Sequence, residues 1–194
     1  MYNKVRLIDT VRIAPELLGD DVHNAVWIAL INKLEGEIDK KLGAIVAIID
    51  VVEVGEGHII AGDGAVYYDA TFDAVVFKLE LQEIIEGSVV EIVEFGAFIG
   101  IGPMDGLVHV SQITDEYISF DSKNARLVTK ETNRSLSEGD HVRARVVALS
   151  INEREPRDSK IGLTMRQPAL GRIEWIKEHT NVQNNKEFAE AEYT

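Results

Sequence analysis

The chain of 194 residues is 45% hydrophobic and 27% charged, an ordinary globular composition with room for two small domains. The absence of cysteine excludes disulfide bonds, a thiolate zinc site and a cysteine nucleophile. A formal net charge of −13 argues against a generic nucleic-acid-binding protein, because such proteins are usually basic. No run of about 18 apolar residues could span a bilayer, and charged residues interrupt the N-terminus, so we expect a cytoplasmic protein that does not enter a membrane.

The charge is unevenly distributed along the chain. Residues 1–80 carry a net charge of −7, residues 81–121 carry −8 without any lysine or arginine, residues 122–172 carry +5, and residues 173–194 carry −3. One basic segment therefore lies inside an acidic chain, and a nucleic acid would have to follow a restricted track across it. The alternative interpretation is that the acidic surface only keeps the protein soluble.

Strand-like patterns dominate the first eighty residues. Apolar residues alternate loosely over 2–13, and two segments rich in β-branched and aromatic residues follow at Ala44–Val54 and Ala65–Leu79. With one intervening helix, these strands predict a compact α+β domain over residues 1–80. In this domain a long helix covers one face of an antiparallel sheet.

The helix has recognisable signals at both ends. Asp20 or Asp21 can cap its N-terminus, and apolar residues recur at helical spacing from Val22. The two lysines at 40–41 would suit the dipole of its last turn, and Gly43 is placed to follow its end. The pattern thus predicts a helix that continues almost to Gly43.

Five strand-like runs with glycine-bearing turns predict a small closed β-barrel over residues 81–172, after a boundary near Ile84–Gly87. The runs are Val89–Glu94, Ala97–Ile101, Gly106–Val110, Val142–Leu149 and Lys160–Met165. The polar segment 112–138 interrupts them as an insertion with weak structure of its own, and Asn152–Asp158 is expected to be a charged hairpin loop. Residues 173–194 are predicted to form a C-terminal helix and a loose acidic tail.

The first barrel segment carries the sequence Phe95-Gly-Ala-Phe98. Residues three apart point to opposite faces of an ideal strand, but a bulge or bend at Gly96 could bring both rings onto one surface. Exposed rings there would form a platform for stacking bases, worth about 1–3 kcal/mol per base, and His109 on the following strand could join it. The alternative interpretations are that both rings belong to the barrel core and that His109 is structural.

Four cations of the basic segment could pair with phosphate groups: Arg143, Arg145, Lys160 and Arg166. The alternative is that they form a solvated charged face. No spacing of histidines or carboxylates indicates a metal site or a nucleophile–base pair, and no glycine pattern indicates a nucleotide loop. We therefore expect no metal, no cofactor and no catalytic residue.

In their order, these motifs resemble the S1 domain, an RNA-binding OB-fold. The resemblance runs from Gly87 to Arg166. It includes Phe95-Gly-Ala-Phe98, Gly106-Leu-Val-His-Val-Ser111, Gly139-Asp-x-Val142-x-Ala144 and Lys160-Ile-Gly-Leu-Thr-Met165. Two departures are the long insertion 112–138 and Ser150-Ile-Asn152, where the S1 pattern often has an aspartate. The resemblance implies an all-β OB-fold barrel of S1 type that binds single-stranded RNA.

Up to about residue 178 the chain is similar to the larger stalk subunits of archaeal RNA polymerase, the E-prime family. These subunits are counterparts of the seventh subunit of eukaryotic RNA polymerase II. The matching stretches include Val46–Asp50, Gly62-Asp-Gly64, Phe72-Asp-Ala-Val75 and Gly102–Ile113. The resemblance implies a non-catalytic subunit of DNA-directed RNA polymerase. It would form a heterodimer with a small helical partner, the F polypeptide of the polymerase, dock on the core subunits and meet nascent RNA through the S1 barrel.

Four glycines near the middle of the first domain would contribute to the docking tip, since glycine lets another backbone approach closely: Gly55, Gly57, Gly62 and Gly64. Tight turns are the alternative role for these glycines. The alternative function for the chain is an S1 RNA-binding protein of another assembly, such as the exosome. A nuclease is disfavoured, because no carboxylate cluster emerges from the sequence.

Overall fold

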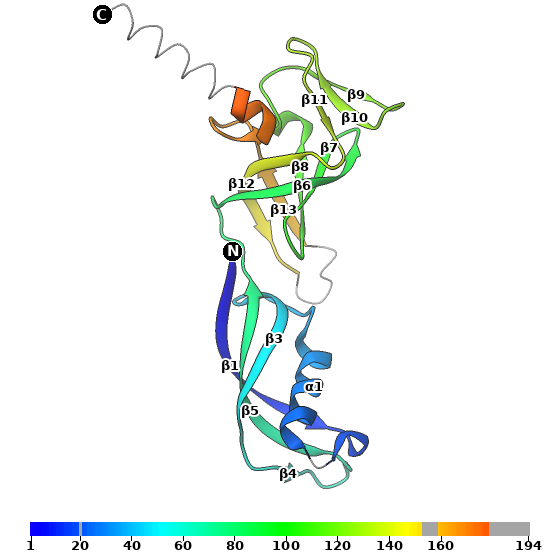
Figure 1. Ribbon diagram of the computed structural model, residues 1–194. Coiled ribbons are helices and arrows are strands. Elements are labelled where there is room, and N and C mark those ends of the chain that lie inside the picture. Colours follow the sequence, from blue (N-terminus) through cyan, green and yellow to red (C-terminus); the bar gives the residue numbers. More distant parts are fainter. Residues whose placement is uncertain (20, 153–158, 179–194) are drawn as a thin grey trace, which may run out of the picture. The chain divides into compact units, whose positions relative to one another are not determined.

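The structure is a computed structural model that describes residues 1–19, 21–152 and 159–178 (Figure 1). The chain divides into two compact units, one of Met1–Leu79 and one that starts at Glu80. The first unit combines a helix with an antiparallel sheet and the second is a small β-barrel, which confirms the predicted fold class. Within these described ranges, no helix is both long and apolar enough to cross a membrane.

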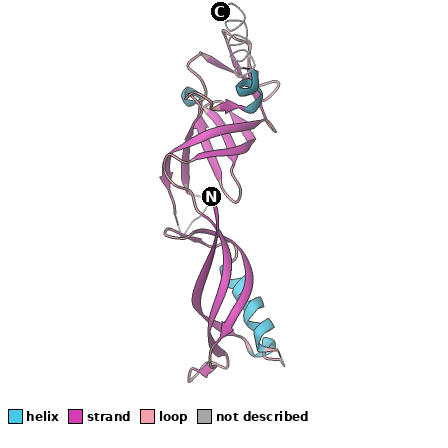
Figure 2. Cartoon of the chain, turned by 60° about the vertical axis from the view of Figure 1, so that its left-hand side comes forward, coloured by secondary structure: helices cyan, strands magenta, loops and turns pink. Residues whose placement is uncertain are grey.

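The N-terminal unit is a sheet with its one long helix on one face (Figure 2). The strands lie in the order β1-β5-β3-β2, and β4 pairs with the start of β5. Their bounds are β1 Tyr2–Ile13, β2 Ile38–Asp39, β3 Gly43–Val54, β4 His58–Ile59 and β5 Val66–Phe77. Between β1 and β2 the chain forms a short 3-10 helix, η1 (Pro15–Leu17), and the helix α1 (Val22–Leu34).

A hydrophobic core joins α1 to the sheet. Val26 and Leu30 of α1 and Phe72 of β5 are each fully buried within it. Burial of one such side chain stabilises the fold by about 1.5–3 kcal/mol. The helix is therefore held by packing on the sheet, which leaves the opposite face of the sheet to solvent.

The predicted start of α1 is confirmed, but its predicted end is wrong. The backbone N–H of Asn24 donates to Asp21 Oδ1 at 3.1 Å, so Asp21 is the N-terminal cap. The helix ends at Leu34. Gly36 follows with φ +86°, the left-handed conformation that commonly terminates a helix and that glycine adopts without strain.

The lysines at 40–41 and Gly43 serve the sheet instead. The Asp39 carboxylate accepts hydrogen bonds from the backbone N–H groups of Lys41 and Leu42 (2.7 and 2.8 Å), which tightens the turn from β2 into β3. These bonds lower the pKa of Asp39. Gly43 has φ +91°, and a Cβ there would overlap the carbonyl oxygen of Phe77. The sheet therefore requires glycine at this position.

Three β-bulges bend β3 along its length. Its register with β5 slips by one residue three times, and the extra residues are Val46, Ile49 and Val52. Their side chains are 37%, 47% and 45% exposed, whereas the intervening Ile45 and Ile48 are 5% exposed. Each bulge adds twist, so one side of β3 stays on the core while an aliphatic stripe faces solvent.

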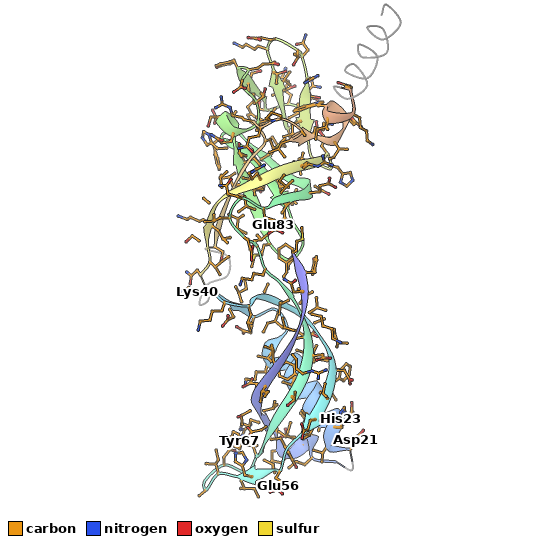
Figure 3. All side chains as sticks on the ribbon, turned by 90° about the vertical axis from the view of Figure 1, so that its left-hand side faces the viewer. Asp21, His23, Lys40, Glu56, Tyr67 and Glu83 are labelled. Atoms are coloured by element: carbon orange, nitrogen blue, oxygen red, sulfur yellow. The ribbon has the colours of Figure 1, made fainter. Side chains whose placement is uncertain are left out.

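Side chains of α1 and its C-terminal cap bond to the backbone of β3. Glu35 Oε1 accepts a hydrogen bond from the N–H of Ile48 at 2.9 Å. His23 Nε2, on the residue labelled in Figure 3, lies 2.7 Å from the carbonyl oxygen of Val51. These two contacts satisfy backbone groups that would otherwise be open to pairing with another strand.

The second unit is a five-stranded barrel with a short additional strand. The strands lie in the order β13-β8-β7-β6-β12-β14, and pairing of β12 with β13 closes the barrel. The bounds are β6 Ile84–Val93, β7 Gly96–Gly100, β8 Asp105–His109, β12 His141–Ser150, β13 Lys160–Thr164 and β14 Gly171–Arg172. β8 and β13 are parallel, and the other pairs are antiparallel.

The expectation of weak structure at 112–138 is wrong. After the 3-10 helix η2 (Val110–Gln112), the insertion forms an antiparallel sheet of β9 (Ile118–Asp121), β10 (Arg126–Thr129) and β11 (Ser135–Ser137). Leu127 pairs with Phe120 on one side and Leu136 on the other, and both leucines are buried. A single apolar row is enough to fix these short strands.

The described residues end at 178, soon after the barrel. Residues 173–178 are helical, as predicted for the start of this region. The predicted acidic tail at 179–194 lies outside the described residues. So does the predicted charged loop Asn152–Asp158, apart from Asn152 itself.

Candidate nucleic-acid interface

Phe95 and Phe98 lie together on the outside of the barrel. Phe95 occupies the turn between β6 and β7 and is 50% exposed, and Phe98 is half-buried on β7. Their ring centroids are 6.5 Å apart with an interplanar angle of 83°, an edge-to-face pair. The core positions of β7 are taken by Ala97 and Ile99, which are fully buried, so neither phenyl ring fills the barrel.

Of the two alternatives at Gly96, a bulge and a bend, the bulge is not what exposes the pair: the chain turns tightly just before Gly96. Val93 pairs directly with Gly96, which leaves Phe95 in a two-residue turn where strand alternation does not apply. The glycine has a different role: a Cβ on Gly96 would overlap the carbonyl oxygen of Val108 on β8. Gly96 therefore permits the close approach of β7 and β8 beneath the two rings.

His109 ends β8 directly opposite Gly96, on the same edge as the rings. The backbone N–H of Val110 donates to the carbonyl oxygen of Phe95 at 2.8 Å, which ties the two loops together. His109 Nδ1 accepts from the N–H of Ser111 at 3.2 Å and lies 2.8 Å from Ser111 Oγ. In the neutral ring the proton is therefore on Nε2, which leaves an exposed N–H donor beside the phenyl rings.

Arg166 is the predicted cation that reaches this edge. Its Nη1 donates to the carbonyl oxygen of Ser111 at 3.3 Å, and Nε donates to Asp115 Oδ1 at 2.7 Å. Nη2 contacts the same carboxylate oxygen. The structure thus brings together Phe95, Phe98, His109 and Arg166, a set we call the platform edge.

The other three predicted cations lie elsewhere. Arg143 and Arg145 are on β12, which pairs with β6, β13 and β14 but with neither β7 nor β8. Arg143 Nε donates to Glu86 Oε1 at 2.8 Å, and Arg145 Nε is buried with no hydrogen-bond partner among the described residues. Lys160 opens β13, which runs parallel to β8, so it lies toward the start of β8, whereas His109 ends that strand.

Sequence reasoning missed several residues around the platform edge. Leu107 pairs with Phe98 and is half-buried, and Glu91 pairs with Phe98 from β6 and is exposed. Alternation along β8 puts Leu107 on the same face as His109, so that signal was available. The contact of Asp115 with Arg166 spans 51 positions, and no local pattern predicts it.

The four predicted docking glycines lie at one end of the N-terminal unit, in the turns around β4. Figure 3 labels Glu56 and Tyr67 at this end. Gly55 donates its N–H to the carbonyl oxygen of Asp69 at 2.8 Å, Gly57 packs on the ring of Tyr68, and Gly62 has φ +92°. Gly64 lies beside Pro15. We call the segment 55–65 the tip.

An ion pair and two exposed isoleucines, none of them predicted, complete the tip. Arg12 donates two hydrogen bonds to Asp63 (2.8 and 2.7 Å), and the Tyr67 hydroxyl donates a third at 2.7 Å. These bonds hold the pKa of Asp63 well below its usual range. Ile59 and Ile60 are 73% and 48% exposed on the same loop.

Two family descriptions match successive parts of this fold. Residues 8–64 match the "SHS2 domain found in N terminus of Rpb7p/Rpc25p/MJ0397", and residues 78–159 match the "S1 RNA binding domain". The second match contains the outward rings and His109. The class is therefore a two-domain protein in which an SHS2 domain precedes an S1 RNA-binding domain.

Two relatives that match over nearly their whole length, and a third that matches over less than half, identify the family within this class. The DNA-directed RNA polymerase subunit Rpo7 of Sulfolobus acidocaldarius is 39% identical over 179 residues, which cover 92% of this chain and 96% of the relative. Rpo7 of Saccharolobus solfataricus is 39% identical over 178 residues, 91% of this chain and 97% of the relative. The RNA polymerase III subunit RPC8 of Saccharomyces cerevisiae is 38% identical over 87 residues, 45% of this chain and 41% of the relative.

The chain belongs to the Rpo7 family of DNA-directed RNA polymerase subunits. This membership confirms the predicted resemblance to archaeal polymerase subunits. It also confirms the expectation of an accessory polymerase subunit in place of an enzyme that acts alone.

Proposed function

We propose that this protein forms the stalk of a cytoplasmic archaeal RNA polymerase with a small helical partner, the F polypeptide. It docks on the core through the tip and holds nascent single-stranded RNA on the platform edge. The observation that carries the RNA proposal is the outward position of Phe95, Phe98 and His109 within the matched S1 domain. Three π-faces and the Nε2–H donor of His109 suit unpaired bases.

Charge decides the direction of the RNA track. Phe98 has Glu91 beside it on β6, Phe95 follows Glu94 in the turn, and residues 81–121 contain no lysine or arginine. Phosphate groups are repelled there, so the rings hold bases while the RNA backbone runs away from β6, along the side of η2. Arg143 and Arg145, on the far strand β12, are not needed for this track.

Docking through the tip is supported by exposed apolar side chains on a firmly held loop. Ile59 and Ile60 are exposed, and the Arg12–Asp63–Tyr67 cluster fixes the loop beneath them. Apolar side chains presented on a fixed loop are the usual contact points of a protein interface. The tip therefore suits a protein partner better than a nucleic acid.

Pairing with the small partner is supported by the aliphatic stripe of β3. Val46, Ile49 and Val52 are exposed in a row, and Asp50 and Glu53 flank them. The carboxylates disfavour RNA there and favour a partner helix with basic residues beside its apolar face. Since Glu35 and His23 already bond to backbone groups of β3, the partner would pack on side chains and would not add a strand.

A pull-down from native extract with the tagged protein tests the assembly. We expect the large polymerase subunits and one small helical protein, identified by mass spectrometry. Recovery of exosome or ribosomal proteins without polymerase would reject the stalk proposal. A gel shift with single-stranded RNA, at a stated salt concentration, tests the platform edge separately: the Phe98→Ala and His109→Ala double variant should lose binding and still recover polymerase.

A further inference from the structure

A concave site adjoins the platform edge. It has a volume of about 500 Å³, and all its lining residues belong to the second unit. Apolar walls come from Ile113, Pro168, Trp175 and Ile176, among others, and Arg166 also lines the site. Pockets of this size with apolar walls and a few polar groups are the usual form of small-ligand sites.

The site begins where the platform edge stops. His109 contacts Ser111, and the Ser111 carbonyl oxygen accepts from Arg166 Nη1. Two further bonds join η2 to the end of β13: Met165 N–H to the carbonyl oxygen of Gln112 at 2.7 Å, and Thr164 Oγ1 to Gln112 Oε1 at 2.9 Å. An RNA strand that runs from His109 past Ser111 to Arg166 reaches the pocket without crossing the acidic β-strand β6.

The polar groups of the pocket are nearly neutral in sum. Arg166 is paired with Asp115, and Arg134 lies 3.6 Å from Glu178 and 5.8 Å from the centroid of the Trp175 ring. A phosphate group would have to displace a carboxylate from an arginine. A nucleobase is neutral, presents two apolar faces to Trp175 and the aliphatic wall, and carries both donors and acceptors on its edge for Asp115 and the arginines.

We propose that this pocket is a second nucleobase subsite, which takes one unstacked base of the single-stranded RNA that lies on the platform edge. The inference rests on the proposed RNA function and extends it by naming where the strand goes after His109. An RNA too short to reach the pocket then binds through the rings alone, and a longer RNA gains one stacked base.

The fluorescence of Trp175 can report whether a base occupies this subsite. The chain contains two tryptophans, Trp27 and Trp175, so Trp27→Phe leaves Trp175 as the only one. In this background we would titrate the full chain with oligoadenylates of three and of twelve nucleotides. Three nucleotides match the three π-faces of the platform edge. The twelve-mer should quench Trp175 fluorescence, and the trimer should not.

A filling substitution tests the same idea by affinity. Thr114 lines the pocket and is half-buried, so Thr114→Phe should place a ring inside it. The matched control is Ser119→Phe on the exposed side of β9, which adds the same ring away from the pocket. We expect Thr114→Phe to weaken twelve-mer binding about tenfold relative to Ser119→Phe, to abolish the quenching and to leave trimer affinity unchanged. The two variants should melt within a few degrees of each other.

The outcomes separate the two proposals. If the twelve-mer binds Thr114→Phe as tightly as it binds Ser119→Phe, the subsite is rejected while RNA binding on the platform edge stands. If Trp175 responds to polymerase core and not to RNA, the pocket is a protein contact and the subsite is again rejected. If neither oligonucleotide binds the unsubstituted chain, the proposed RNA function itself fails. If Thr114→Phe unfolds the chain, the length dependence of Trp175 quenching decides.

Discussion

The two units expose apolar side chains of different kinds, and the difference indicates different ligands. The barrel presents Phe95 and Phe98, with the polar His109 at the same edge. The N-terminal sheet presents the aliphatic side chains of Val46, Ile49 and Val52, which offer contact area but no π-face. Aromatic faces suit bases, whereas an aliphatic stripe beside carboxylates suits a protein partner.

The backbone irregularity that exposes these side chains also differs between the two units. In β3, three bulges push one residue in three out of the ladder. In the barrel, Phe95 is exposed because it lies in the β6–β7 turn, and Gly96 lets β7 and β8 come close below it. The bulges and the turn both interrupt the simple alternation of buried and exposed residues. In both places the interruption coincides with a candidate binding surface.

The largest expected effect is on stability, and it distinguishes a core phenylalanine from one on the binding surface. Phe72 is fully buried in the N-terminal core, so Phe72→Ala should lower the free energy of unfolding by about 3–5 kcal/mol. Chemical denaturation followed by circular dichroism measures it. The same truncation at the half-buried Phe98 should cost far less stability. Equal losses at the two positions would mean that Phe98 is a core residue, and the contrast between the units would fail.

The next effect concerns the aromatic surface. Phe98→Ala should weaken binding of single-stranded RNA by about 1–3 kcal/mol, roughly fivefold to 150-fold, because a stacking face is lost. Fluorescence anisotropy at fixed salt measures the change. Tyr117→Ala is the matched control, since Tyr117 is 66% exposed on the same unit but lies outside the platform edge. Similar losses in the two variants would indicate that RNA binds exposed aromatic rings without a defined site.

A smaller effect is expected at the aliphatic stripe. Ile49→Asp should weaken binding of the small helical partner by about tenfold, because a charge would be buried in an apolar contact. RNA affinity should not change. Ile8→Asp on β1 is the control, as Ile8 is an equally large side chain and is 76% exposed on the same sheet. If Ile8→Asp weakens the complex and Ile49→Asp does not, the partner lies over β1.

The smallest effect is a dependence of the N-terminal unit on pH. Hydrogen bonds from Arg6 and Lys4 hold the pKa of Asp73 well below its ordinary value. The carboxylate therefore stabilises the fold fully above its unfolded pKa of about 3.9, and this contribution disappears as the pH falls toward the lower folded pKa. In Asp73→Asn, thermal melts should show a deficit at pH 7 that shrinks toward pH 2. A deficit that stays constant would assign the effect to packing.

Alternation and turn residues were sufficient to predict most of the strands. They failed for the end of α1, since Lys40 and Lys41 suit a helix end as well as they suit the turn that Asp39 builds. They also failed at 112–138, where strands of four, four and three residues are too short for a periodic signal. The bulges of β3 did leave a trace: pairs of aliphatic residues recur every three positions from Ile45 to Val52.

The candidate site was only partly accessible from sequence. The motif from Phe95 to His109 is local, so its rings and imidazole could be predicted. The positions of Arg143, Arg145 and Lys160 depend on which strands are neighbours in the closed barrel, and composition carries no information on that. The pocket beside Trp175 combines segments more than sixty positions apart, and only the folded chain reveals it.

The Arg12–Asp63–Tyr67 cluster has a kinetic consequence for assembly. A loop that must become ordered on contact slows association and lowers the affinity gained per contact. Here Arg12 on β1 and its cross-strand neighbour Tyr67 on β5 both donate hydrogen bonds to Asp63 before any partner arrives. A protein that docks through this tip can therefore join its complex in a single collision of correct orientation. Its association rate constant is then set by diffusion and by the orientation of the two surfaces, and no folding step of the loop limits it.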